Sequence, residues 1–383
     1  MKKSTNINTF KKGITFLLSA VLFLSSFAVT GCGDYYPDYD LPDDTGKVTS
    51  SKTNNTEPVE QKETVSSGSF NEQGQFEFNP EAINQFYANE IKSKPEQVEL
   101  AKIILRAVYN LEATIELTDE YEKEDFDQAL RLARFSNPML SCVDFVSEDY
   151  KSIELLYYPP SEADIVLDET TPTEEVGKEF REFEAFVTET INNNISSEDS
   201  KTEQAKKIYS VLVNECELDY EAEKEFNLFV NNGQDFISCN NPDIIDVTNT
   251  HKLPFWSYLG LYQFFLTQLD IEYICVLGAG PYQETEYEKI NEYTHEIEFA
   301  WFWTIITDGG NSYNTDILME KILLDSQRES NPSRESDLIF FGMSDETRKK
   351  TFNFVNRKYV MTMNPLAQVD KQVEFPACKT DYK

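Results

Sequence analysis

The sequence predicts an α+β fold in which a buried central helix packs on an antiparallel sheet, preceded by a mainly helical module. The helix is predicted in the first part of residues 255–278, where apolar side chains recur at steps of three and four and cover most faces. The sheet is predicted from two runs: residues 271–277 are rich in β-formers, and residues 295–306 alternate apolar and other side chains. The turn signal Asp308-Gly309-Gly310-Asn311 then predicts a hairpin that returns through residues 312–316.

The N-terminal stretch has the pattern of a bacterial lipoprotein. Residues 1–31 contain four lysines and an apolar run at 14–29, as a signal peptide does. The run ends in Val29-Thr30-Gly31-Cys32, which resembles the lipobox, whose cysteine is lipidated after cleavage. A transmembrane helix is the alternative, but the run is short for one. We therefore expect an extracytoplasmic protein anchored in the cell membrane, at the bacterial cell surface, by acyl chains such as palmitate on Cys32.

Composition separates a linker from a first folded module. Residues 32–78 are polar and acidic with few aliphatic side chains, which is typical of a disordered tether. Residues 79–195 show helical spacing in several places and one strand pattern at 152–158, which predicts a helical or α+β N-terminal module. Ser200 with Glu203 forms a capping-box pattern that opens the next helix.

The net charge of −34 restricts the partners. A surface of that sign repels nucleic acid and anionic lipid, so we expect neither, and solubility outside the cell is the simplest reason for the acidity. Apart from Cys32 the chain has five cysteines, none of them at metal-ligand spacing, and two histidines, so neither a metal site nor a cofactor is expected. Five is an odd number, so at least one thiol stays unpaired within a single chain; Cys239 and Cys378 are candidates for a disulfide.

Taken together, the core segments resemble the transglutaminase-like superfamily, which has a papain-like fold. The family's central block, a helix running into a strand, is matched at Tyr258, Gly260, Leu266, Leu269, Ile271, Glu272, Val276 and Gly278. Its hairpin block is matched without a gap at Trp303, Ile305, Ile306, Gly310, Tyr313 and Asp316. An aromatic pair shortly before Ser344-Asp345-Glu346 is a third shared feature. The resemblance implies a transglutaminase-like domain over residues 196–365, followed by a C-terminal tail at 366–383.

The family's catalytic positions are changed in this chain. The chemistry needs a cysteine thiolate at the start of the central helix, a histidine base on the sheet and an acid that orients the imidazole. In the matching register these positions hold Phe255, Trp301 and Asp316, so only the acid is kept. Phenylalanine cannot form a thiolate and tryptophan cannot act as the base, so the resemblance implies a catalytically inactive relative, a pseudoenzyme.

Four side chains are candidates for lining a former cleft: Trp256, Tyr258, Trp303 and His251. For the aromatic residues, packing in the core is the simpler interpretation, and for His251 it is exposure on a loop. Three classes of function stay open. We favour a binding or interaction module for a peptide, protein or glycan. The others are an enzyme with relocated groups, for which Cys239 and His251 have the necessary loop freedom, and a structural spacer at the cell surface.

Overall fold

The computed structural model describes residues 68–90, 93–117, 121–147, 151–158, 173–220, 243–279, 300–352 and 376–382. All of them belong to one compact unit, residues 66–383. The predicted signal peptide, Cys32 and most of the predicted linker lie outside the described residues. No helix in the described ranges is both long and apolar enough to span a membrane.

The first half of the compact unit is helical with a small sheet. Its elements, in chain order, are β1 (Ser69–Phe70), β2 (Phe76–Glu77), α2 (Gln85–Glu90), α3 (Pro95–Tyr109), β3 (Thr114–Glu116), α4 (Lys123–Ser136), the 3-10 helix η1 (Pro138–Cys142), β4 (Val143–Val146), β5 (Ser152–Tyr157) and α5 (Thr173–Asn194). β5 pairs with β3 on one side and β4 on the other, both antiparallel. The predicted strand at 152–158 is therefore the middle strand of a sheet.

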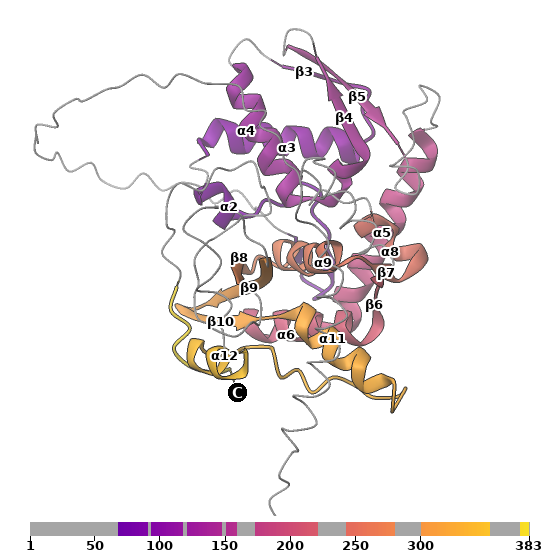
Figure 1. Ribbon diagram of the computed structural model, residues 1–383. Coiled ribbons are helices and arrows are strands. Elements are labelled where there is room, and N and C mark those ends of the chain that lie inside the picture. Colours follow the sequence, from indigo (N-terminus) through magenta and orange to yellow (C-terminus); the bar gives the residue numbers. More distant parts are fainter. Residues whose placement is uncertain are drawn as a thin grey trace, which may run out of the picture. The chain divides into compact units, whose positions relative to one another are not determined.

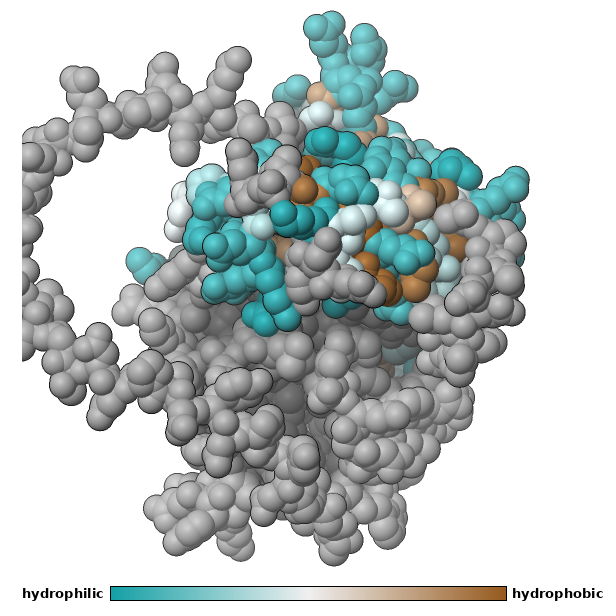
Figure 2. Space-filling model, turned by 90° about the horizontal axis from the view of Figure 1, so that it is seen from above, coloured by the Kyte–Doolittle hydropathy of each residue, from teal (hydrophilic) through white to brown (hydrophobic). Residues whose placement is uncertain are grey.

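That sheet has one buried and one exposed face. Ile153 and Leu155 of β5 are buried, whereas Glu154 between them and Glu116 of β3 are exposed. Figure 2 looks onto the end of the fold where α3, α4 and this sheet lie, and its coloured surface is mostly hydrophilic with apolar patches between. An acidic outer face fits the strongly negative charge of the chain.

The second half contains the central helix and an antiparallel sheet. Its elements are α6 (Lys201–Glu215), β6 (Glu217–Leu218), α8 (Asp243–Thr250), β7 (Lys252–Leu253), α9 (Phe255–Gln268), β8 (Glu272–Ala279), β9 (Ala300–Asp308), β10 (Asn311–Thr315), α11 (Ile317–Arg328) and α12 (Asp345–Phe352). The strand order is β10-β9-β8, and both pairings are antiparallel. The fold is thus α+β, as predicted.

Helix α9 is the centre of this half (Figure 1). It contacts α6, α8 and α11 as well as β7 and β8, and its described side chains are almost all buried. The backbone closes the helix at Leu269, and Asp270, with φ of 54°, turns the chain directly into β8. The predicted helix that leads into a strand is therefore confirmed.

Turn chemistry explains the hairpin between β9 and β10. Gly309 and Gly310 have φ of 56° and 83°, and Asp308 pairs with Asn311. Two successive positive φ values define the hairpin turn that follows the strand twist, and glycine reaches them without steric cost. The predicted turn is confirmed.

One apolar core runs through both halves. Phe183 of α5 stacks on Phe264 of α9, with ring centroids 5.5 Å apart, and Phe78 lies 6.1 Å from the same ring. Gln268 and the backbone of Asn79 exchange hydrogen bonds of 2.9 and 3.1 Å. The apolar core is therefore continuous across residue 195, the end of the predicted first module.

Candidate functional site

The candidate site lies where β9, β10 and α11 meet. The last hairpin pair is Thr304 with Thr315, so the next position of the same register sets Trp303 opposite Asp316. Asp316 is fully buried and is the N-cap of α11, because its Oδ1 accepts a hydrogen bond of 3.1 Å from the backbone N–H of Met319. The hairpin thus delivers this acid to a helix start inside the protein.

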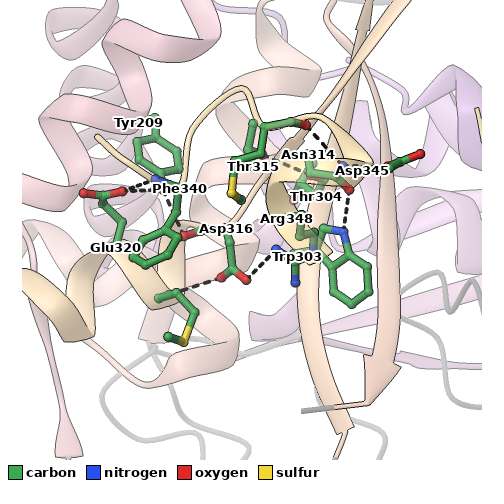
Figure 3. A network of polar contacts seen from close by, with 12 residues as sticks. Tyr209, Trp303, Thr304, Asn314, Thr315, Asp316, Glu320, Phe340, Asp345 and Arg348 are labelled. Atoms are coloured by element: carbon green, nitrogen blue, oxygen red, sulfur yellow. Dashed lines mark hydrogen bonds and ion pairs between the residues drawn. The ribbon is translucent and has the colours of Figure 1, made fainter. Parts of the chain in front are cut away.

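Arg348 fills the space beside Asp316 and Trp303 (Figure 3). Its Nη1 donates to Oδ2 of Asp316 at 3.0 Å, and its Cζ lies 4.0 Å from the centroid of the Trp303 ring. The side chains of Arg348 and Asp316 are 4% and 0% exposed. Burial lowers the pKa of Arg348, while the Asp316 carboxylate favours its charged form. A guanidinium starts from so high a pKa that the pair stays ionic.

A second chain of hydrogen bonds fixes the Trp303 ring. The indole Nε1 donates to Oδ1 of Asn314 at 3.1 Å. The amide of Asn314 donates in turn to Oδ1 of Asp345 at 2.9 Å and to the carbonyl of Met343 at 3.2 Å. These bonds tie β9 and β10 to the start of α12, the helix that carries Arg348.

Glu320 holds the loop that passes over α11. Its carboxylate accepts hydrogen bonds from the backbone N–H of Phe340 at 2.7 Å and from the hydroxyl of Ser336. The hydroxyl of Tyr209 in α6 donates to the backbone carbonyl of Asp316 at 2.9 Å and lies 3.5 Å from Oε2 of Glu320. Burial raises the pKa of Glu320, and the hydrogen bonds oppose that shift. Oε1 of this carboxylate accepts from Ser336, and Oε2 accepts from Phe340 and Tyr209, which is a structural role.

Phe255 and Tyr258 lie in the core at the start of α9. Phe255 is 8% exposed and meets Tyr220 edge to face, with ring centroids 5.9 Å apart. Tyr258 is buried, and its hydroxyl donates to the carbonyl of Leu212 in α6 at 2.6 Å. The structure therefore places Tyr258 in the helix packing and not on a cleft wall.

The remaining predicted site residues are scattered. Trp303 is buried against Arg348, as described above. His251 is exposed at the end of α8 with φ of 52°. Trp301 pairs with Gly278 through the backbone of β9, and Trp256 belongs to α9, but the side chains of both lie outside the described part. Cys239 lies outside it as well.

Three of the described thiols are not activated. Cys142, Cys216 and Cys275 are buried, and burial raises the pKa of each to about 12. A thiol with so high a pKa is almost entirely protonated at neutral pH and reacts slowly. Within the described ranges, no group of three or more His, Cys, Asp or Glu side chains has the arrangement of a metal site.

The sequence did not predict the role of Arg348, which pairs with Asp316 and lies over the Trp303 ring. The Ser344-Asp345-Glu346 feature pointed to the right segment, but nothing in it marks the arginine that follows. The need for a partner follows only from the structure, in which Asp316 is buried, because a buried carboxylate needs a cationic or hydrogen-bonding partner.

Neither a scan against protein-family models nor a search of curated proteins finds a match for this sequence.

Proposed function

We propose that this chain is a membrane-anchored extracytoplasmic lipoprotein whose folded part is a catalytically inactive transglutaminase-like domain. It acts as a binding or interaction module for a peptide, protein or glycan, held at the cell surface by lipid on Cys32. The sequence supports the anchor through Val29-Thr30-Gly31-Cys32, and it supports the family through the matched blocks of the central helix and hairpin.

The order of the elements supports the family proposal. A buried helix, α9, runs into β8, and β9 and β10 follow as antiparallel neighbours. This is the sequence of elements that a papain-like core requires. The positions proposed for nucleophile, base and acid fall at the first residue of α9, near the start of β9 and directly after β10.

The ion pair between Arg348 and Asp316 carries the proposal that the domain is inactive. A triad acid works by accepting a hydrogen bond from an imidazole and stabilising its charged form. Here the Oδ2 atom accepts from a guanidinium at 3.0 Å and Oδ1 caps α11. Asp316 therefore has a sufficient structural reason to be an aspartate, and its retention does not argue for catalysis.

A structural spacer is the second candidate, because the space around Trp303 and Asp316 is packed. The two residues are 2% and 0% exposed, so neither of them lines an open groove. Binding would then use another surface, or the domain would only support its neighbours. The enzyme alternative rests on Cys239 and on His251, which is exposed at the end of α8.

The test of inactivity uses the purified full chain with a glutamine-containing peptide, an amine donor and iodoacetamide. We expect no transamidation, no deamidation, no peptide cleavage and no thiol that reacts at the rate of an activated thiolate. The variants Cys239→Ala and His251→Ala serve as controls. Acyl transfer that either variant abolishes would overturn the proposal and establish a relocated active site.

The test that separates binding from spacing uses a peptide array and a glycan array probed with the full chain. Saturable binding to one class of probe supports the interaction module. If a folded and monodisperse sample binds no member of either array, the result would favour the structural spacer.

A further inference from the structure

Helix α12 carries a buried charge at its contact with the rest of the protein. It has eight residues, and among its side chains from Asp345 to Lys350 only Arg348 is buried. Most helices pack through an apolar stripe, whose burial supplies the free energy of docking. The side chains of α12 from Asp345 to Lys350 form no such stripe, and the contacts that they make with the rest of the chain include several polar ones.

The C-terminal residues 376–382, here called the strap, supply several of those contacts. The backbone N–H of Asp345 donates to the carbonyl of Cys378 at 2.8 Å, and the N–H of Cys378 donates back to Oδ2 of Asp345 at 3.2 Å. The carboxylate of Asp381 accepts from the N–H of Ser344 at 2.7 Å and from the hydroxyl of Thr347 at 2.8 Å. An acid at the start of a helix also complements the helix dipole. The strap therefore caps α12 from outside.

Tyr382 anchors the end of the strap. Its ring lies edge to face with Tyr313 and Phe341, with centroids 5.5 and 6.1 Å away, and its hydroxyl donates to Glu203 of α6 at 3.0 Å. A Cβ added at Gly342 would lie 2.6 Å from that of Tyr382, and Gly342 has φ of 70°. Tyr382 thus fixes the end of the strap to β10, to Phe341 and to α6 through contacts that do not involve α12.

We propose that the strap is a latch for α12, and that Arg348 occupies from within the chain a guanidinium-binding site made by Trp303 and Asp316. The site has the two elements that such a group needs, an aromatic face for the planar cation and a carboxylate for its N–H groups. When the latch opens, α12 can leave and the site accepts an arginine side chain of another peptide. This inference rests on the described contacts and does not depend on the family proposed above.

Arg348 and an external arginine compete for the same site, and the latch favours Arg348. As long as the strap holds α12, Arg348 is present at a high effective concentration and excludes an external arginine. Variants at Asp381 and Tyr382 weaken the strap and lower that concentration, while Trp303, Asp316 and Arg348 stay unchanged, as does Cys378 of the strap, which packs in the same apolar cluster as Trp303. The strap and the site can therefore be tested by separate variants.

The first experiment tests the latch by hydrogen exchange of the full chain. The double variant Asp381→Ala with Tyr382→Ala removes the cap and the anchor, and Lys379→Ala is the matched control, because Lys379 lies in the strap with an exposed side chain. We expect amides of α12 to exchange at least about tenfold faster in the double variant than in the control, since several hydrogen bonds are lost. Equal exchange in the two variants would overturn the latch.

The second experiment tests the site with N-acetyl-arginine amide, and N-acetyl-citrulline amide is the uncharged control probe. We expect Arg348→Ala to gain thermal stability with the arginine probe alone, because a ligand that binds only the folded state stabilises it. The original chain should show no such gain. A folded Arg348→Ala protein that responds to neither probe, or equally to both, would refute the site.

The strap double variant provides the same test if Arg348→Ala does not fold. It keeps the buried pair, so the arginine probe should displace Arg348 and accelerate exchange of α12 further, whereas the citrulline probe should not. No acceleration by the arginine probe would then count against the guanidinium site while leaving the latch result intact.

Discussion

Asp316 shows how one side chain can be fixed by two structural tasks. It caps α11 through Oδ1 and pairs with Arg348 through Oδ2, and both contacts are buried. The two tasks differ chemically, because asparagine can still accept the capping hydrogen bond but cannot neutralise a guanidinium. Substitution at this position therefore separates the cap from the charge.

We expect Asp316→Asn to lower the free energy of unfolding by roughly 3 to 5 kcal/mol, because it leaves Arg348 buried without its counter-charge. Urea denaturation of the full chain measures the change. The double variant Asp316→Asn with Arg348→Met should recover much of the loss, since it removes the unpaired charge as well. A double variant whose loss equals the sum of the two single losses would show that the pair is not coupled.

Glu179 on α5 gives the residue-scale prediction for pH. Burial raises its pKa to about 7, with further contributions from Asp246 of α8 and from Glu175 and Glu182; Lys178 opposes the shift. Since the pKa is higher in the folded state than the ordinary 4.5, the folded state binds a proton more tightly than the unfolded chain does. The contribution to stability is complete below pH 4.5 and is lost as the pH rises through about 7.

We therefore expect Glu179→Gln to raise the thermal unfolding temperature at pH 8 relative to the original chain, and to change it little at pH 4.5. Glu189→Gln is the matched control, because Glu189 lies on the same helix, is exposed, and is not among the groups that shift the pKa of Glu179. Unfolding temperatures of the three proteins across pH 4.5 to 8 measure the effect. An identical pH profile for all three would show that Glu179 does not titrate in this range.

At the scale of elements, α9 is the helix on which the fold depends. Leu266 is 0% exposed, and we expect Leu266→Ala to cost about 2 to 5 kcal/mol, the range for a truncated core side chain. Ile339→Ala is the control, because Ile339 is 44% exposed and should lose less than about 0.5 kcal/mol. Chemical denaturation of both variants checks this, and a small loss at Leu266 would contradict the central role of α9.

The elements that sequence predicted best are those with local signals. Apolar spacing marked α9, β-forming residues marked β8, and two adjacent glycines marked the turn from β9 to β10. At the helix that Ser200 opens, the predicted cap is present, because its hydroxyl accepts from the N–H of Glu203 at 3.2 Å. The carboxylate of Glu203, however, accepts from Tyr382 near the end of the chain.

The contacts that sequence could not predict are polar and distant along the chain. Arg348 and Asp316 are 32 residues apart, and nothing periodic links them. Residues 376–382 showed no pattern because single hydrogen bonds, the Tyr382 ring and the buried Cys378 hold them, rather than an apolar stripe. Tyr258 matched the expected family pattern, but only the packing of α6 on α9 shows that its hydroxyl serves Leu212.

At the scale of the whole molecule, an acidic folded unit follows a predicted lipid anchor. The net charge of the full chain, −34, disfavours direct contact with anionic headgroups, so an anchor would have to overcome electrostatic repulsion. Two or more acyl chains on one residue supply enough apolar area for stable attachment, whereas one chain gives only weak binding.

We expect Cys32→Ser to leave the protein unprocessed or to release it from membranes, because serine cannot carry the thioether lipid. Membrane fractionation and the mass of the mature N-terminus measure this, with Cys239→Ser as a control that leaves residues 29–32 intact. Normal processing and normal membrane attachment of Cys32→Ser would show that the anchor lies elsewhere.

The buried pair of Arg348 and Asp316 also affects how the sequence can evolve. Loss of one partner strands the other charge in the interior, so selection for folding alone preserves both. Among descendants of this chain, an aspartate at position 316 would therefore persist without any catalytic reason and would resemble a surviving active-site residue. Its true role would show in joint variation, since sequences that replace Arg348 should also replace Asp316. Counting how often positions 316 and 348 change together would show whether folding or a former catalytic role preserves the aspartate.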